Sequence, residues 1–184
     1  MTKNHEDDSR DVIENAKALV IDSIAETMDL YGVTRSAGTL YGTMYFEKDM
    51  TLDEMREKLG MSKPSMSTGV KKLQSYSIVK QTFRKGTRRQ TFVAEKDFFN
   101  FFSNFFSRKW IREAKINMDA VKKAQAELEM IMNSTDIDED TRFEAERIHR
   151  QLEGSKPYYK WLLKLVDSIE SGEIFEYIPI DSEE

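Results

Sequence analysis

Apolar residues recur at steps of three and four along much of the chain, which is the spacing of one face of an α-helix. The first such stretch covers residues 7–31, and after Gly32 a shorter helix capped by Thr34 or Ser36 runs to about residue 46. The apolar positions of the first stretch are Val12, Ile13, Ala16, Leu19, Val20, Ile24 and Met28. The pattern predicts a long amphipathic helix followed by a short one.

Capping residues predict two further short helices. Thr51 and Glu54 have the spacing of a capping box, and the helix that they start ends at Gly60. Ser62 is placed to cap the next helix, which runs to about residue 74, and Pro64 falls in its first turn, where a missing N–H costs little. The expected inward positions are Leu52, Met55, Leu59, Met61, Met66, Val70 and Leu73. Two such helices around a glycine turn are typical of a helix-turn-helix.

Two β-strands are predicted at residues 79–83 and 90–94, joined by a basic turn over residues 84–89. The chain then returns to helical spacing from about residue 96 to residue 132, with Gln125 in one slot of a heptad-like pattern. A helix-turn-helix followed by a hairpin is the winged arrangement that grips duplex DNA. The expected fold class is mainly α with a small β-wing, a winged helix-turn-helix plus long dimerisation helices.

The C-terminal part is expected to hold two more helices, at residues 141–152 and 158–169, after an acidic linker over residues 133–140. The sequence Gly-Ser-Lys-Pro at residues 154–157 separates them, because proline breaks a helix interior. An acidic tail over residues 173–184 follows.

Three regions are expected. Residues 1–35 form an N-terminal dimerisation helix, residues 36–95 a winged helix-turn-helix DNA-binding domain, and residues 96–184 a C-terminal helical dimerisation and effector region. The first helix and the helix over residues 111–132 carry apolar stripes that a small winged domain cannot cover alone. A homodimer buries both stripes, and its operator should be an inverted repeat with half-sites about one helical turn apart. The alternative is a monomeric helical bundle.

Positive charge is confined to one segment. The net charge is −5, yet residues 58–94 contain nine Lys or Arg and no Asp or Glu, so the rest of the chain carries −14. This confinement indicates a polyanion partner, double-stranded DNA. The negative charge of the rest of the chain would orient the protein as it approaches the DNA.

The helix after Ser62 carries short hydroxyls near its start and lysines further along. Short polar groups can approach base edges in the major groove while lysines meet phosphates, and arginines on a projecting ribbon enter the minor groove. The predicted DNA-binding residues are Ser62, Lys63, Ser65, Ser67, Thr68, Lys71, Lys72, Arg84, Lys85, Arg88 and Arg89. The competing interpretations are an ordinary corner of two packed helices and an exposed basic loop without a partner.

Other chemistry is not indicated. The chain has no Cys, its two histidines, His5 and His149, are far apart, and it has no glycine-rich phosphate loop and no metal-ligand spacing. We therefore expect no enzyme activity, no cofactor and no metal. The polar N-terminus and the short apolar runs predict a cytoplasmic protein without a membrane partner.

Residues 36–94, with a helix on either side, resemble the MarR-type winged-helix regulators. Residues 23–33 (SIAETMDLYGV), 40–46 (LYGTMYF) and 59–68 (LGMSKPSMST) resemble the GbsR-type branch more closely. The resemblance extends roughly from residue 12 to residue 132. It implies a repressor that responds to choline and controls uptake and synthesis of the osmoprotectant glycine betaine.

Residues 97–110 contain six Phe and one Trp. Aromatic faces bind cations that lack N–H donors, and a quaternary ammonium such as choline is recognised by an aromatic cage. The predicted effector-binding residues are Phe102, Phe106 and Trp110 with Tyr41 or Tyr45. Rival cage residues are Tyr158, Tyr159 and Trp161, and the competing interpretation is that all these rings only fill a core.

The sequence thus predicts a homodimeric, sequence-specific DNA-binding repressor with a small cationic effector, choline. The alternative is a winged-helix accessory factor that binds DNA without a small-molecule sensor.

Overall fold

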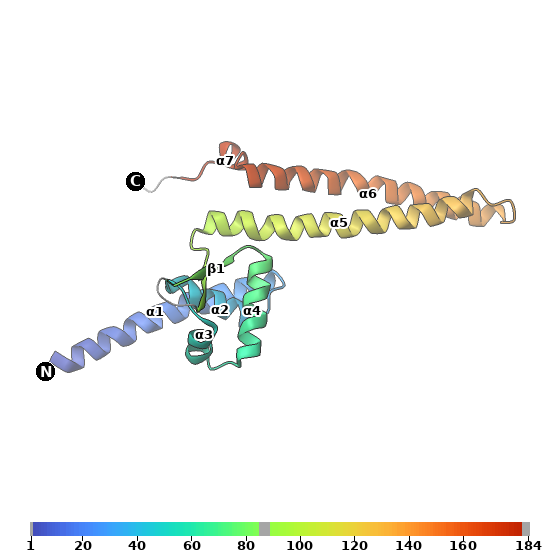
Figure 1. The fold of residues 1–184 in the computed structure, drawn as a ribbon. Coiled ribbons are helices and arrows are strands. Elements are labelled where there is room, and N and C mark those ends of the chain that lie inside the picture. Colours follow the sequence, from blue (N-terminus) through green and yellow to red (C-terminus); the bar gives the residue numbers. More distant parts are fainter. Residues whose placement is uncertain (1, 85–88, 182–184) are drawn as a thin grey trace. The chain divides into compact units, whose positions relative to one another are not determined.

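The computed structural model describes residues 2–84 and 89–181, with the backbone alone for residues 2–7. Figure 1 shows helices and a small two-stranded sheet, which confirms the predicted fold class. The elements group into two compact units, residues 1–101 and residues 102–184. In chain order they are α1 (Thr2–Leu30), α2 (Arg35–Phe46), α3 (Leu52–Leu59), α4 (Lys63–Ser75), β1 (Val79–Phe83), β2 (Gln90–Ala94), α5 (Phe98–Met132), α6 (Glu139–Ser171) and α7 (Ile174–Tyr177).

Helices α1 and α2 approach closely because two glycines face α1. A Cβ atom built on Gly38 would lie 2.7 Å from the Cα atom of Ala25, and one on Gly42 would lie 3.1 Å from the Cα atom of Ile21. A side chain at position 38 would overlap the backbone of Ala25, whereas one at position 42 would make a tight contact with Ile21, so the close approach depends above all on Gly38. The predicted N-terminal helix therefore packs within the first unit along the helix that precedes the helix-turn-helix.

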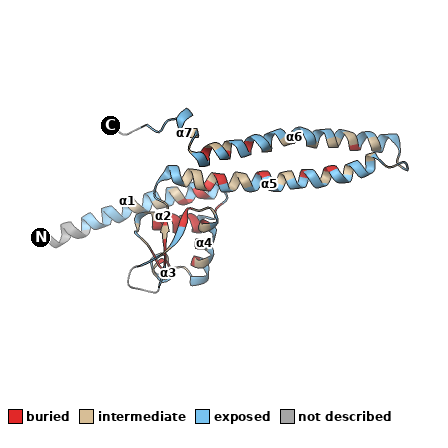
Figure 2. Ribbon diagram, turned by 45° about the horizontal axis from the view of Figure 1, so that its top comes forward, coloured by how far each residue is buried: buried red, intermediate tan, exposed pale blue. Residues whose placement is uncertain are grey.

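The core of the first unit is centred on α2, where most residues are buried (Figure 2). Tyr41 is only 1% exposed, and its hydroxyl donates a 2.6 Å hydrogen bond to the carbonyl oxygen of Glu95. The other large, fully buried side chains of this unit include Met28, Leu40, Met44, Met55, Met66, Leu73 and Ile78. A core rich in methionine fills irregular gaps between short helices.

The predicted caps are confirmed at Thr51 and Ser62, whereas the cap predicted at Thr34 or Ser36 is not formed. Thr51 Oγ1 accepts a hydrogen bond from the backbone N–H of Glu54, and Glu54 Oε2 accepts one from the backbone N–H of Thr51, so the capping box is complete. Gly60 ends α3 with a φ of +65°, a left-handed conformation that favours glycine. The Ser62 side chain caps α4. Thr34 precedes α2, but its side chain makes no capping hydrogen bond.

Strands β1 and β2 occupy the predicted residues and pair antiparallel, with Val79 opposite Ala94 and Phe83 opposite Gln90. Met50 extends the pairing beyond the hairpin. Its N–H donates to the Phe92 carbonyl at 2.9 Å, and the N–H of Phe92 donates to the Met50 carbonyl at 2.8 Å. The base of the wing is thereby fixed to the segment that leads into α3.

In the second unit, α5 and α6 run antiparallel and are joined by polar contacts along their length. Tyr158 donates to Glu113, and the buried Gln125 donates to Glu153 at 3.0 Å. Gln125, which the heptad pattern placed in an apolar slot, is therefore satisfied by a carboxylate from the opposite helix. An unpaired amide in this position would be costly.

The prediction of two separate helices at residues 141–152 and 158–169 is wrong, because α6 is continuous and contains Pro157 in its interior. An uninterrupted heptad spacing crosses the proline, and Pro157 itself lies on the exposed face. Burial of this stripe offsets the hydrogen bond that proline removes. The inward positions of α6 are Ala145, Ile148, Leu152, Ser155, Tyr159, Leu162, Val166 and Ile169.

Candidate nucleic-acid interface

Buried apolar side chains pack α3 and α4 of the helix-turn-helix against the core. Met55 of α3 and Met66, Val70 and Leu73 of α4 are each at most 1% exposed. Rigid packing on this side fixes the direction in which the opposite face of α4 presents its polar side chains. All of these residues were predicted to point inward.

The outer face of α4 presents the predicted contact residues to solvent, although Ser67 is half-buried. The Ser62 and Ser65 hydroxyls lie 2.8 Å apart, and the Nζ atom of Lys72 lies 5.0 Å from the centre of the Tyr76 ring. Hydroxyls at the start of the helix and lysines in its later turns give both base-edge and phosphate donors. The exposed residues of this face are Ser62, Lys63, Ser65, Thr68, Lys71 and Lys72.

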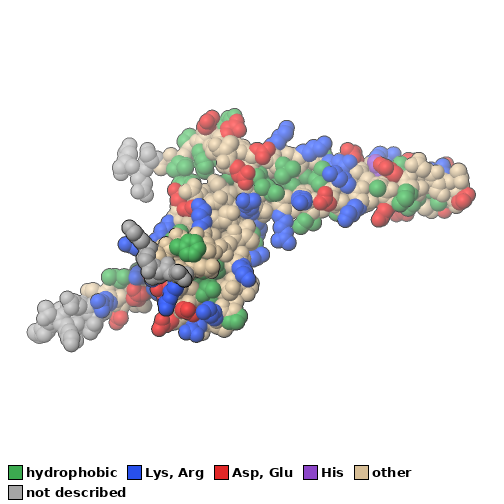
Figure 3. Space-filling view, viewed as in Figure 1, with side chains coloured by type: hydrophobic (Ala, Val, Ile, Leu, Met, Phe, Trp, Pro, Cys, Tyr) green, Lys and Arg blue, Asp and Glu red, His purple; other side chains and the backbone are tan. Residues whose placement is uncertain are grey.

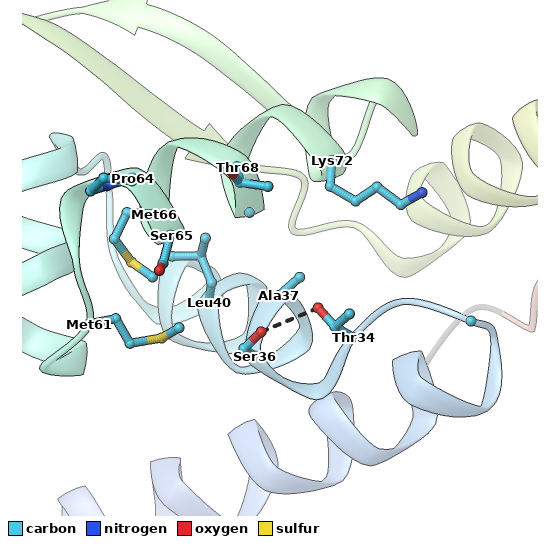
Figure 4. Close-up of a pocket in the computed structure, with 12 residues that line it drawn as sticks. Thr34, Ser36, Ala37, Leu40, Met61, Pro64, Ser65, Met66, Thr68 and Lys72 are labelled. Carbon is cyan, nitrogen blue, oxygen red and sulfur yellow. Dashed lines mark hydrogen bonds between the residues drawn. The ribbon is translucent and has the colours of Figure 1, made fainter.

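A hollow of about 620 Å³ lies between the start of α2 and this helix (Figure 4). Its α4 side includes Ser65, Thr68 and Lys72, and its α2 side includes Thr34 and Ser36, whose hydroxyl oxygens lie 3.2 Å apart. None of the described residues that line the hollow is acidic. The hydroxyls of Thr34 and Ser36 were not among the predicted contact residues, because their position beside α4 depends on how α2 packs.

The wing brings one predicted residue into an intramolecular cluster. Arg84 Nε lies 3.1 Å from Asp49 Oδ2, and Arg84 Nη1 lies 3.1 Å from Glu54 Oε1. Arg84 therefore links the wing to the start of α3, and its guanidinium is already engaged by two carboxylates. Arg89 is exposed, whereas Lys85 and Arg88 lie outside the described residues.

Two lysines of residues 58–94, the basic segment that contains no Asp or Glu, also form ion pairs. Lys58 contacts Glu47, and Lys63 Nζ lies 3.0 Å from Asp53 Oδ1. Figure 3 shows acidic side chains beside basic ones around α3. The hydrogen bond from Lys63 lowers the pKa of Asp53, and the backbone N–H of Thr51, followed by Arg84, lowers the pKa of Glu54. Both carboxyls are therefore negatively charged at neutral pH.

The predicted effector residues lie in both units. In the first, the Tyr41 ring packs on Phe101 with centroids 5.2 Å apart, and the Tyr45 ring stacks on Phe98 at 5.3 Å. Burial and the nearby Glu95 raise the pKa of Tyr41 well above its usual value, so its hydroxyl remains a donor.

In the second unit, Phe102, Phe106 and Trp110 form a continuous row in which successive ring centroids are 5.3 Å apart. All three side chains are half-buried. The rival rings Tyr158 and Trp161 lie 6.5 Å apart on α6, and both are exposed. The row on α5 is thus partly accessible, as a ligand face must be.

No helix in the described part of the chain is both long enough and apolar enough to cross a membrane. Among residues 8–84 and 89–181, no three His, Asp or Glu side chains are grouped so that they could hold a metal ion.

Comparison with known proteins places this geometry in a family. Residues 98–176 match the family described as GbsR family transcriptional regulator, C-terminal helical hairpin. The chain is 61% identical over 170 residues to the HTH-type transcriptional repressor GbsR of Bacillus subtilis (strain 168), covering 92% of this chain and 94% of that protein. It is 31% identical over 170 residues to the HTH-type transcriptional repressor OpcR of the same organism, covering 92% of each chain.

A solved structure described as a transcriptional regulator has a TM-score of 0.61 to this chain at 15% identity. It covers 86% of this chain and 98% of its own, which shows likeness of fold. The resemblance expected from the sequence is confirmed over most of the chain by the GbsR relative. The chain belongs to the GbsR family of transcriptional regulators.

Proposed function

We propose that the protein is a homodimeric repressor that binds an inverted-repeat operator through α4 and the wing and is controlled by choline. The observation that carries the DNA-binding part is the exposed row of hydroxyls and lysines on α4, whose opposite face buries Met66, Val70 and Leu73. The 61% identity to a helix-turn-helix repressor supports the same assignment. Control of genes for glycine betaine synthesis or uptake is part of this proposal.

The dimer is supported by the apolar surface that α1 leaves uncovered. Leu19 is 75% exposed and Val12 63% exposed, and Ile13 and Val20 are exposed beside them. A second copy would remove this surface from water, at about 25 cal/mol for each Å² of apolar area buried. Two-fold symmetry then implies an operator with two matching half-sites.

The choline site is proposed on the row formed by Phe102, Phe106 and Trp110. A quaternary ammonium lacks N–H donors, so it is recognised by ring faces, with a contribution of about 2 kcal/mol when desolvated. Ligand binding changes DNA affinity only if it favours one of the two states, DNA-competent or DNA-incompetent.

DNA binding is expected to depend steeply on salt. Titration of a fluorescent duplex carrying the gene's own upstream region, between 50 and 300 mM NaCl, should give log Kd rising linearly with log salt. A duplex with one half-site scrambled should bind more weakly and with a smaller slope. A flat salt dependence, or equal binding to the scrambled duplex, would contradict the proposed dimeric DNA interface.

Choline binding is expected to depend on Trp110. In a calorimetric titration, Trp110→Ala should weaken choline affinity about 30-fold, which corresponds to losing about 2 kcal/mol of cation–π interaction. Operator binding without choline should stay close to that of the natural protein. Circular dichroism establishes that the variant is folded.

The matched control is Trp161→Ala, since the chain has only two tryptophans and Trp161 is exposed on α6. This variant should bind choline normally. If Trp161→Ala loses choline binding while Trp110→Ala keeps it, the site lies instead on the rival rings around Tyr158. If the folded natural protein binds no choline, the effector part of the proposal is wrong.

One observation favours the alternative, a DNA-binding factor without a sensor. Tyr41 is buried, hydrogen-bonded and packed on Phe101, and Phe105 is fully buried, so part of the aromatic cluster already serves as core. Under this alternative neither choline nor glycine betaine changes the affinity for the upstream DNA.

A further inference from the structure

The acid-free basic segment is partly neutralised by the acidic residues just before it. Every acidic side chain of residues 47–54 forms an ion pair with a cation of residues 58–94. The pairs are Glu47 with Lys58, Asp53 with Lys63, and both Asp49 and Glu54 with Arg84. The segment therefore presents less free positive charge than its composition suggests.

The pair between Asp53 and Lys63 lies at the start of α4. The carboxylate oxygen lies 3.0 Å from the ammonium nitrogen, a distance at which a phosphate oxygen also binds lysine. The Asp53 and Lys63 side chains are 57% and 56% exposed, so a phosphate can approach the lysine from solvent. An exposed pair of this kind is weak, so a phosphate contact can replace it.

We infer that Asp53 is an internal counter-ion that limits the phosphate-dependent, sequence-independent part of DNA affinity by occupying Lys63. This inference rests on the proposed DNA-binding function. While Lys63 is paired with Asp53, the lysine neutralises less phosphate charge and releases fewer counterions from the duplex. The short hydroxyls that approach base edges, such as Ser65, are unaffected, so the sequence reading and the overall affinity are set by different residues.

The repressor therefore binds DNA of any sequence with lower affinity than its number of lysines and arginines would allow. A DNA-binding protein with many unpaired cationic side chains stays bound to the numerous non-specific sites of a genome. Neutralising Lys63 within the protein reduces this retention without removing the lysine.

The test is Asp53→Asn, measured against operator DNA and against an unrelated duplex of the same length. Freeing Lys63 in both subunits should tighten binding to both duplexes about three- to tenfold at 100 mM salt, and should steepen the salt slope by up to about 0.9 per subunit. An unfolding curve for the variant shows whether α3 is intact, because Asp53 also lies in the first turn of that helix.

Two comparisons separate the ion pair from the general effect of removing a negative charge. Glu57 lies one turn further along α3, is exposed and forms no ion pair with any described side chain, so Glu57→Gln makes the same charge change without freeing a lysine. In a Lys63→Gln background, Asp53→Asn should have no larger effect than Glu57→Gln.

The inference is overturned if Asp53→Asn and Glu57→Gln act equally in the natural background, or if the effect of Asp53→Asn survives in the Lys63→Gln protein. Either result means that Asp53 acts only through long-range charge. If the natural protein binds neither duplex, the proposed DNA-binding function has failed instead.

Discussion

Gly38→Ala is expected to destabilise the first unit by about 2 kcal/mol. The added Cβ would lie 2.7 Å from the Cα and 3.1 Å from the carbonyl oxygen of Ala25, so α1 must move away from α2. Overpacking against backbone costs about 3 kcal/mol, and the better helix propensity of alanine returns about 1 kcal/mol. The measurement is the midpoint of urea unfolding at a fixed protein concentration, followed by circular dichroism.

Gly154→Ala is the matched control, since this glycine is also helical and a Cβ there would meet nothing within 4 Å. The same substitution should therefore stabilise the second unit by about 1 kcal/mol. A stabilising effect at both glycines would mean that α1 and α2 are not in backbone contact at Gly38.

Lys71→Gln combined with Lys72→Gln is expected to weaken operator binding at least about 100-fold at 100–200 mM salt. The two side chains are exposed on the outer face of α4, and a dimer would lose four phosphate contacts. Each lost contact removes about 0.9 from the slope of log affinity against log salt, so the slope should fall by about 3.6. Fluorescence anisotropy over a salt series measures both quantities.

Lys122→Gln combined with Lys123→Gln makes the same charge change at two adjacent exposed lysines of α5. It should leave the salt slope unchanged and alter affinity less than threefold, as expected for lysines that make no phosphate contact. Equal losses in the two double variants would show that overall charge, and not the face of α4, determines DNA binding.

Features of the helix-turn-helix set by nearby residues could be predicted from the sequence. The capping box of Thr51 and Glu54 and the cap at Ser62 join residues three apart, and the left-handed turn at Gly60 depends on that residue alone. The two strands could also be predicted, because residues with high β-propensity lie on either side of the basic turn.

Features that depend on distant packing were not predictable. Residues 154–157 have a composition that breaks helices, yet α6 continues through them with a heptad stripe whose burial depends on its partner helix. The contact of Gly38 with Ala25 likewise depends on two helices meeting, so the sequence marks Gly38 only as a weak helix former.

The candidate interface was predicted in its position but not in its electrostatics. The lysines of α4 lie where the helical pattern put them, but the partners of Lys63 and Arg84 come from the acidic stretch before the basic segment. Counting charge by segment overlooks such neighbours. Which aromatic rings can reach a ligand depends on how the rings pack on one another. The sequence does not show that Tyr41 is buried while its aromatic neighbours remain partly accessible.

The Glu54 carboxylate makes substitutions at the start of α3 and in the wing depend on one another. Its Oε2 atom closes the capping box with Thr51, and both of its oxygens accept hydrogen bonds from Arg84 of the wing. Glutamine can keep the hydrogen bond to the backbone but loses the ion pair, and aspartate is one methylene shorter. Sequence drift at the start of α3 and drift at the wing are therefore not independent, and new DNA preferences should be easier to acquire through Ser65 or Thr68 than through Glu54.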